Sequence, residues 1–313
     1  MSKKDLILTL LVAIIWGANF TVIKLGLEGV PSLLLVAIRF ALTAFPAVFF
    51  LQRPNVPWSY WLAYGLFAGV GQFGCLFYAM EIGMPAGIAS IVIQSQVFFT
   101  LILAALLLKE TLRIEQIAGL LIATLGLYFI SGARLGGNGE SVPLGPFLLT
   151  LAGAFCFAIG NVVIRYAARH ALSQRVNLNT FHLLIWSSLV PPLPLLALAF
   201  LLESPQTIFQ ALTNLTGQSL FAILYLILGA TLFGYGTWNS LMAKYSTDKI
   251  TPWALLVPVT GLLTAQIVLG EQLAKQQWLA SLAIVFGLVV TNFGHLPLEY
   301  YRKSIHFNRQ HQP

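Results

Sequence analysis

Apolar stretches of about 20 residues recur along the whole chain, and only short polar segments separate them. A helix rises 1.5 Å per residue, so each stretch is long enough to cross the ~30 Å hydrocarbon core of a bilayer. Only 9% of the residues are charged, whereas a soluble domain carries about 25%. The sequence therefore predicts an all-α integral membrane protein.

Ten membrane spans follow from these stretches, because turn residues such as Pro31, Pro85 and the Ser204-Pro205 pair separate them. The most Gly-rich connection lies near the midpoint. It divides the chain into a first half of five spans (1–132), a linker (133–143), a second half of five spans (144–296) and a tail (297–313). The expected spans are Leu6–Lys24, Ser32–Leu51, Trp58–Met80, Gly87–Leu108, Ile114–Ser131, Leu144–Ala168, Leu178–Leu202, Ser219–Met242, Trp253–Gly270 and Gln277–Leu296.

The distribution of Lys and Arg predicts the orientation. Thirteen of these residues fall on the side of the two termini, three fall on the opposite side, and Arg39 lies within a span. Basic residues concentrate on the cytoplasmic side of membrane proteins, so both termini are expected in the cytoplasm. The same distribution explains the net charge of +7 without a nucleic-acid partner.

The two halves repeat one another. The segments Ala89–Leu112 and Ile250–Leu273 have equal length and the same charged end, with Glu110 and Glu271 at matching places. Five spans per half mean that the second half crosses the membrane in the opposite direction, an arrangement that recurs in secondary transporters. Further matches are Phe73-Gly74 with Phe233-Gly234 and Val22-Ile23-Lys24 with Val163-Ile164-Arg165, and their different spacings indicate extra residues in the second half, within Glu203–Gly217.

Several motifs resemble the EamA family of the drug/metabolite transporter superfamily. They are Trp16-Gly17-Ala18-Asn19-Phe20, Met84-Pro85-Ala86-Gly87-Ile88-Ala89-Ser90, Leu255-Leu256-Val257-Pro258-Val259-Thr260-Gly261 and Glu271-Gln272-Leu273. The resemblance implies ten transmembrane helices as two inverted five-helix repeats. It also implies a bacterial inner-membrane exporter of amino acids or related metabolites such as O-acetylserine and cysteine, working by alternating access. Aromatic amino acids, drugs and other metabolites are alternative substrates. A lipid-embedded monomer or homodimer is expected.

Three residues of the first two spans are candidates for substrate binding. Trp16 and Asn19 are three positions apart and share a helix face, so an indole N–H and an amide could grip a small amino acid. Alternatively, Asn19 joins helices by hydrogen bonds. Arg39 is the one unambiguous charge within a span, and no carboxylate lies in the middle of any span. It therefore either binds carbonyl groups near an interface or faces the transport path.

The fourth and ninth spans supply further candidates as opposing cavity walls. Gln94 and Gln96 are two positions apart and are expected on different faces, while Trp253 and Pro258 lie in the matching span. Pro258 lacks a backbone N–H, which favours a bend or a ligand contact. Tyr78, Trp238 and Asn239 complete the set. The alternatives are backbone hydrogen bonds for the glutamines and an interfacial belt for the aromatics.

Residues for other chemistry are sparse. Cys75 and Cys156 each lie inside an apolar span, without metal-ligand spacing. No catalytic constellation, metal site or cofactor motif is evident, so neither an enzyme nor a cofactor is expected. An integral-membrane transferase would need His, Asp, Glu or Ser groups at a membrane face, and a non-transporting scaffold would not need two oppositely inserted halves.

Overall fold

The structure is a computed structural model that describes residues 1–130, 142–245 and 247–293. Every regular element in these ranges is a helix, as expected from the sequence. Nine helices of the described chain have the length and hydropathy to span a bilayer. The helix α7 (Ile114–Ile130) is also apolar but shorter, with 17 residues. Together they form the ten expected spans.

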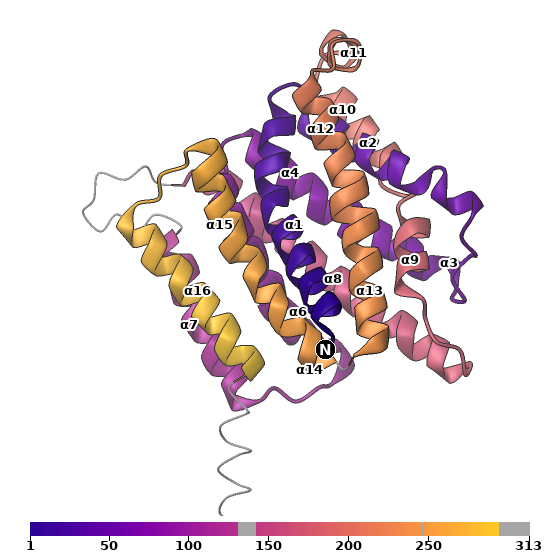
Figure 1. The fold of residues 1–313 in the computed structure, drawn as a ribbon, viewed down its shortest axis with the longest axis vertical. Coiled ribbons are helices and arrows are strands. Elements are labelled where there is room, and N and C mark those ends of the chain that lie inside the picture. The colour runs from indigo at the N-terminus through magenta and orange to yellow at the C-terminus, as the bar shows by residue number, and fades with distance from the viewer. Residues whose placement is uncertain (131–141, 246, 294–313) are drawn as a thin grey trace, which may run out of the picture.

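The first half begins with α1 (Lys3–Leu27) and α2 (Ser32–Ala44), and a short 3₁₀ turn, η1 (Ala47–Phe49), follows α2 (Figure 1). The third span consists of α3 (Trp58–Tyr64), the π-helical segment η2 (Gly65–Phe73) and α4 (Gly74–Glu81). The fourth consists of α5 (Ala86–Val92), the 3₁₀ turn η3 (Ile93–Ser95) and α6 (Gln96–Leu108), and α7 is the fifth.

The second half begins with α8 (Leu144–Ser173), followed by α9 (Thr180–Ser187) and α10 (Pro192–Leu202) as the seventh span. A short helix, α11 (Pro205–Thr213), lies where the sequence predicted extra residues. The eighth span is α12 (Gly217–Leu224), the π-helical segment η4 (Tyr225–Phe233) and α13 (Gly234–Lys244). The ninth is α14 (Thr247–Ile250), the 3₁₀ turn η5 (Thr251–Leu255) and α15 (Leu256–Leu269), and the tenth is α16 (Lys275–Phe293).

Prolines interrupt two of the expected spans. The second span ends as an α-helix at Ala44, just before Pro46, and the seventh is broken between α9 and α10 at Pro191 and Pro192. Proline has no backbone N–H and its ring clashes with the preceding turn, so an α-helix cannot continue through these positions. The expected spans Ser32–Leu51 and Leu178–Leu202 are therefore present but are not continuous helices.

Irregular segments recur at equivalent positions of the two halves. The π-helical segments η2 and η4 have nine residues each and are 160 positions apart. The helices α6 and α15 both end in a left-handed residue, Lys109 with φ 54° and Gly270 with φ 67°. Such a conformation is costly for lysine and free for glycine. The two halves therefore match not only in their sequence motifs but also in their π-helical segments and left-handed helix ends.

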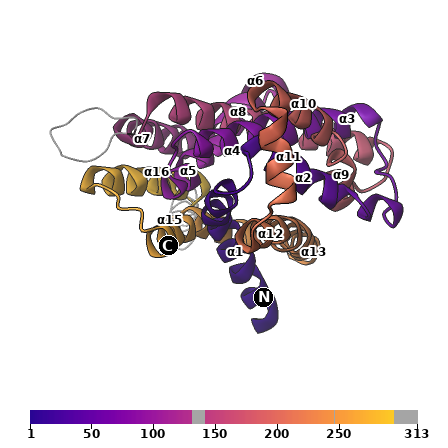
Figure 2. The same cartoon turned by 90° about the horizontal axis from the view of Figure 1, so that it is seen from above.

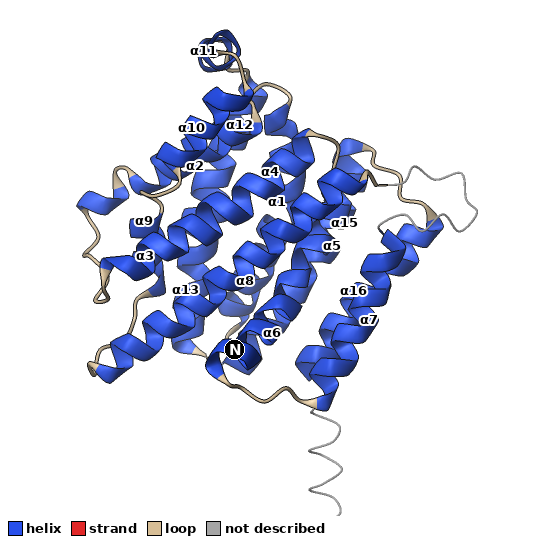
Figure 3. Cartoon of the chain, turned by 180° about the vertical axis from the view of Figure 1, so that it is seen from behind, coloured by secondary structure: helices blue, strands red, loops and turns tan. Residues whose placement is uncertain are grey.

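The helix α1 lies between α15 on one side and α12 and α13 on the other, and its N-terminal end projects from the bundle (Figure 2). Its Gly17 allows this approach to α15, because a Cβ there would lie 1.8 Å from Thr260 Oγ1. The helices α7 and α16 pair along their lengths at one edge of the bundle (Figure 3). We call the end of the bundle at Lys3 the N-terminal side and the end at α11 the far side (Figure 1).

Candidate functional site

A cavity of about 480 Å³ lies between the two halves and is open to the exterior. Its lining comes from the middle of the bundle and from the N-terminal side, where Thr180 begins α9 and Asn292 lies near the end of α16. Other polar and aromatic residues of the lining are Trp16, Asn19, Arg39, Tyr64, Gln72, Gln94, Gln96, Asn161, Tyr235, Trp238 and Asn239. The cavity is therefore accessible from the N-terminal side.

Polar contacts seal the far side. The Glu271 carboxylate, just after α15, accepts hydrogen bonds from the Ala86 and Gly87 backbone N–H groups at 2.7 and 2.9 Å. The first N–H groups of a helix have no partner within the helix itself, and a carboxylate there also interacts favourably with the helix dipole. The Lys24 ammonium donates to the Met80 carbonyl at 2.7 Å, which ties α1 to α4.

The repeat-related carboxylate on the N-terminal side has different partners. Glu110 lies 161 positions before Glu271, yet it accepts from Arg165 at 2.8 Å and from Arg169 at 3.1 Å, both on α8. Both side chains of each pair are substantially exposed. The two sides of the bundle are thus built from equivalent residues in different arrangements, one sealed and one accessible.

Trp16 and Asn19 both line the cavity, as their shared helix face predicted. The indole N–H of Trp16 is not free, because it donates to the Ala230 carbonyl in η4 at 3.0 Å. The ring of Trp16 lies 5.1 Å from both the Tyr235 and Trp238 rings and forms an aromatic wall with them. The Oδ1 atom of Asn19 is buried and has no hydrogen-bond partner among the described residues, so it remains a free acceptor.

Gln94 and Gln96 also line the cavity, although an α-helix would turn them to nearly opposite faces. The 3₁₀ turn η3 begins one residue before Gln94. Three residues per turn place the two side chains about 120° apart, compared with about 160° in an α-helix. The Asn161 amide of α8 donates to Gln96 Oε1 at 2.7 Å and to Thr100 Oγ1 at 3.3 Å, which links the two halves across the cavity.

Asn239 and Trp238 line the cavity on α13. The side-chain amide of Asn239 donates to the Tyr235 carbonyl at 2.8 Å, and its Oδ1 accepts from the Thr180 hydroxyl. Asn239 therefore orients this end of α13 against α9.

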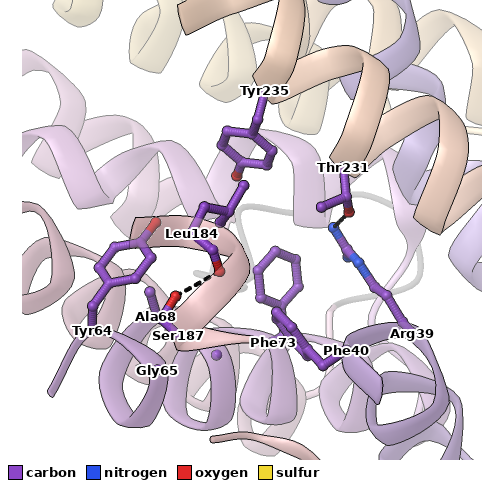
Figure 4. A pocket seen from close by; sticks show the side chains of 11 residues that line it. Arg39, Phe40, Tyr64, Gly65, Ala68, Phe73, Leu184, Ser187, Thr231 and Tyr235 are labelled. Atoms are coloured by element: carbon purple, nitrogen blue, oxygen red, sulfur yellow. Dashed lines mark hydrogen bonds between the residues drawn. The ribbon is translucent and has the colours of Figure 1, made fainter. Parts of the chain in front are cut away.

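Arg39 is only 2% exposed and lies between the two π-helical segments (Figure 4). Its Nη2 donates to Thr231 Oγ1 in η4 at 3.1 Å, and its guanidinium carbon is 4.3 Å from the centre of the Phe73 ring in η2. None of the ion pairs between described residues includes Arg39. A hydrogen bond from a charged group contributes about 1.5–3 kcal/mol and a desolvated cation–π contact about 2 kcal/mol. These contributions offset the ~2.5–3.5 kcal/mol insertion cost of a central arginine.

Tyr78, Trp253 and Pro258 are not among the residues that line the cavity. Tyr78 packs against the hydrophobic core. Pro258 is buried, and its carbonyl accepts from the Ser90 hydroxyl of α5 at 3.4 Å. The part of the ninth span that faces the cavity is Ala254, Leu255 and Val257.

Several lining residues were not predicted from the sequence. Asn161 carried a usable signal, since it is a polar residue in an apolar span, two positions before the repeat match that begins at Val163. Gln72 carried the same signal, since it directly precedes the repeat match Phe73-Gly74, whereas Tyr64 carried none, because an aromatic residue in a span is equally compatible with packing.

Two stretches of the sequence, residues 3–132 and 144–293, match the model of the EamA-like transporter family. The chain belongs to the EamA-like transporter family. This agrees with the expectation from the motifs and with the two repeats of membrane helices, and it makes the chain a multi-pass membrane transporter.

Relatives of this EamA-family transporter cover nearly its whole length. A Salmonella typhimurium protein named probable amino-acid metabolite efflux pump is 43% identical over 294 residues, which are 94% of this chain and 96% of that protein. A protein of the same name from Escherichia coli K12 is 41% identical with the same coverage. A solved crystal structure with 21% identity has a TM-score of 0.61, covering 96% of this chain and all of its own, and shares the fold.

Proposed function

We propose that this transporter exports small amino-acid metabolites, of the size and polarity of O-acetylserine and cysteine, by alternating access. The observation that carries the proposal is the cavity between the repeats, about 480 Å³ and open on one side of the bundle. This volume lies within the range of about 300–1,000 Å³ found for small-molecule sites. The relatives named probable amino-acid metabolite efflux pumps support the substrate class.

The proposed location is the bacterial inner membrane, with both termini in the cytoplasm. The excess of Lys and Arg on the side of the termini supports this orientation. In this orientation the cavity faces the cytoplasm, where an exporter takes up its substrate.

Substrate contacts are proposed for the lining residues that retain hydrogen-bonding capacity. Asn19 Oδ1 is a buried acceptor without a partner among the described residues, and it suits the ammonium group of an amino acid. Gln94 and the Gln96–Asn161 pair offer amides on the facing wall. The wall formed by Trp16, Tyr235 and Trp238 offers an apolar surface for the substrate side chain.

The conformational change is proposed to exchange the roles of Glu271 and Glu110. In this structure Glu271 binds the first two N–H groups of α5, and α14 in the second half begins 161 positions after α5. This spacing equals that between Glu110 and Glu271. By the inverted repeat, the state that is open on the far side would have Glu110 at the N-terminus of α14 and Glu271 released from α5. The same kind of contact, a carboxylate at a helix N-terminus, would then close the far side in one state and the N-terminal side in the other.

Efflux from cells tests the proposal. Cells that produce the protein are loaded with radiolabelled O-acetylserine, cysteine and a panel that includes aromatic amino acids, and release is compared with cells lacking it. Faster release of the small polar compounds is expected. Equal release with and without the protein for the whole panel would contradict the proposed function. Faster release of the aromatic compounds alone would move the substrate class to aromatic amino acids.

A further inference from the structure

The Arg39 side chain borders a small recess of the main cavity (Figure 4). The recess measures about 10 Å³, room for about one water-sized group. It shares Arg39, Tyr64, Phe73, Leu184 and Tyr235 with the lining of the main cavity, so the two spaces adjoin at these side chains. Arg39 therefore stands in the wall between the recess and the main cavity.

The guanidinium in this recess has unused donors. Arginine carries five N–H hydrogens. The Nε and Nη1 atoms of Arg39 are buried and have no hydrogen-bond partner among the described residues, while Nη2 donates to Thr231. Buried donors without partners are rare in folded proteins and each calls for an explanation. No carboxylate forms an ion pair with Arg39 within the described chain.

The surroundings of Arg39 hold it in a fixed position. The side chain leaves α2 and is held between Phe73 of η2 and Thr231 of η4. The Thr231 hydroxyl in turn donates to the Leu226 carbonyl, five positions earlier, as the wider turn of a π-helix permits. π-Helical turns occur frequently at functional sites. Here both repeat-related π-helical segments, η2 and η4, contact the same arginine, Arg39 of the first half.

We propose that Arg39, in the wall shared by the recess and the main cavity, forms an anion subsite for the carboxylate of the transported metabolite, one oxygen of which fits the recess. A carboxylate suits this guanidinium because its oxygens can accept from the unpaired Nε or Nη1 hydrogens together with the second hydrogen of Nη2, in one plane. Substrates must then carry a free carboxylate, which excludes amino-acid esters, amides and purely cationic drugs. This inference rests on the proposed function, since it assigns a chemical group to the same cavity.

Binding to the purified full-length protein tests the subsite separately from transport. The probes are O-acetylserine and cysteine as free acids and as their methyl esters, measured by calorimetry and by thermal unfolding in detergent. The wild-type protein should bind each acid about tenfold or more tightly than its ester. Arg39→Gln should weaken binding of the acids about tenfold and leave the esters unchanged, and Arg39→Lys should restore part of the preference. Arg113→Gln, a change of an exposed loop arginine, should alter neither the binding of the acids nor that of the esters.

A purely structural role for Arg39 gives different results. In that case the substitutions would lower the affinity for acids and esters alike. The ratio of acid affinity to ester affinity would then stay at its wild-type value, which would overturn the proposal. If Arg39→Gln does not fold, the wild type decides, because equal binding of acid and ester, or no binding of any acid, overturns the subsite. Preferential acid binding without transport in liposomes would instead refute the exporter function and leave the subsite standing.

Discussion

Glu271→Gln is expected to open the sealed far side. The wild-type carboxylate accepts two backbone hydrogen bonds, from Ala86 at 2.7 Å and Gly87 at 2.9 Å. A glutamine retains the shape but offers one acceptor oxygen, without charge, and turns an NH₂ group toward a backbone N–H. Hydrogen bonds with a charged partner contribute about 1.5–3 kcal/mol, so the sealed state should lose about 2–3 kcal/mol. This corresponds to a roughly 30- to 150-fold larger population of the open state.

Ser90 offers a position to measure this opening. It is fully buried on α5, where its hydroxyl donates to the Gly87 carbonyl, and it does not line the cavity. In a background with Cys75 and Cys156 replaced by serine, Ser90→Cys should be labelled by a thiol reagent only when the far side opens. The labelling rate of the purified protein should rise with Glu271→Gln by the factor given above.

Glu110→Gln is the matched control, since it changes the repeat-related residue on the accessible side. Exposed ion pairs such as those of Glu110 with Arg165 and Arg169 contribute about 0–1 kcal/mol. The control should therefore not raise the labelling of Ser90→Cys. The reasoning is that the Glu271 hydrogen bonds to the start of α5 hold the far side closed. A labelling rate of Ser90→Cys within twofold of wild type for Glu271→Gln, or an equal increase for both variants, would refute it.

Two further substitutions test the packing and the cavity wall. Gly17→Ala would place a Cβ 1.8 Å from Thr260 Oγ1, so it should cost about 1–3 kcal/mol and lower the thermal midpoint by several degrees. Gly145→Ala, which meets nothing within 4 Å, should leave the midpoint unchanged, and equal midpoints for both variants would contradict the close contact. Asn161→Ala removes the donor to Gln96 and should reduce efflux of O-acetylserine about tenfold at equal expression; unchanged efflux would remove this pair from the site.

The sequence alone predicted the helical class, the ten spans and the inverted repeat, because these depend on hydrophobic length and on matched motifs. It did not predict the π-helical segments η2 and η4, because their apolar, glycine-containing sequences are equally compatible with a regular α-helix. It also missed the breaks at Pro46 and at Pro191-Pro192, where apolar residues continue on both sides of the break.

The candidate site was predictable to the extent that polar residues are rare in the spans. Asn19, Arg39 and Gln96 stand out in apolar surroundings, and the structure brings them to one cavity. Which partners they have depends on tertiary structure. The indole N–H of Trp16 is engaged by a carbonyl of η4, and Pro258 is buried against Ser90 of α5. The repeat pattern in the sequence is compatible with a state open on the N-terminal side and with one open on the far side. It therefore does not indicate which of the two the protein adopts.

Counterflow in proteoliposomes that contain only the purified protein tests the central claim most directly. Vesicles loaded with unlabelled O-acetylserine or cysteine are diluted into the same labelled compound, and labelled compound is followed inside. We expect accumulation well above that in protein-free vesicles, suppressed by excess free acid outside. Accumulation equal to that in protein-free vesicles for both compounds would contradict the assignment of this cavity to small amino-acid metabolites.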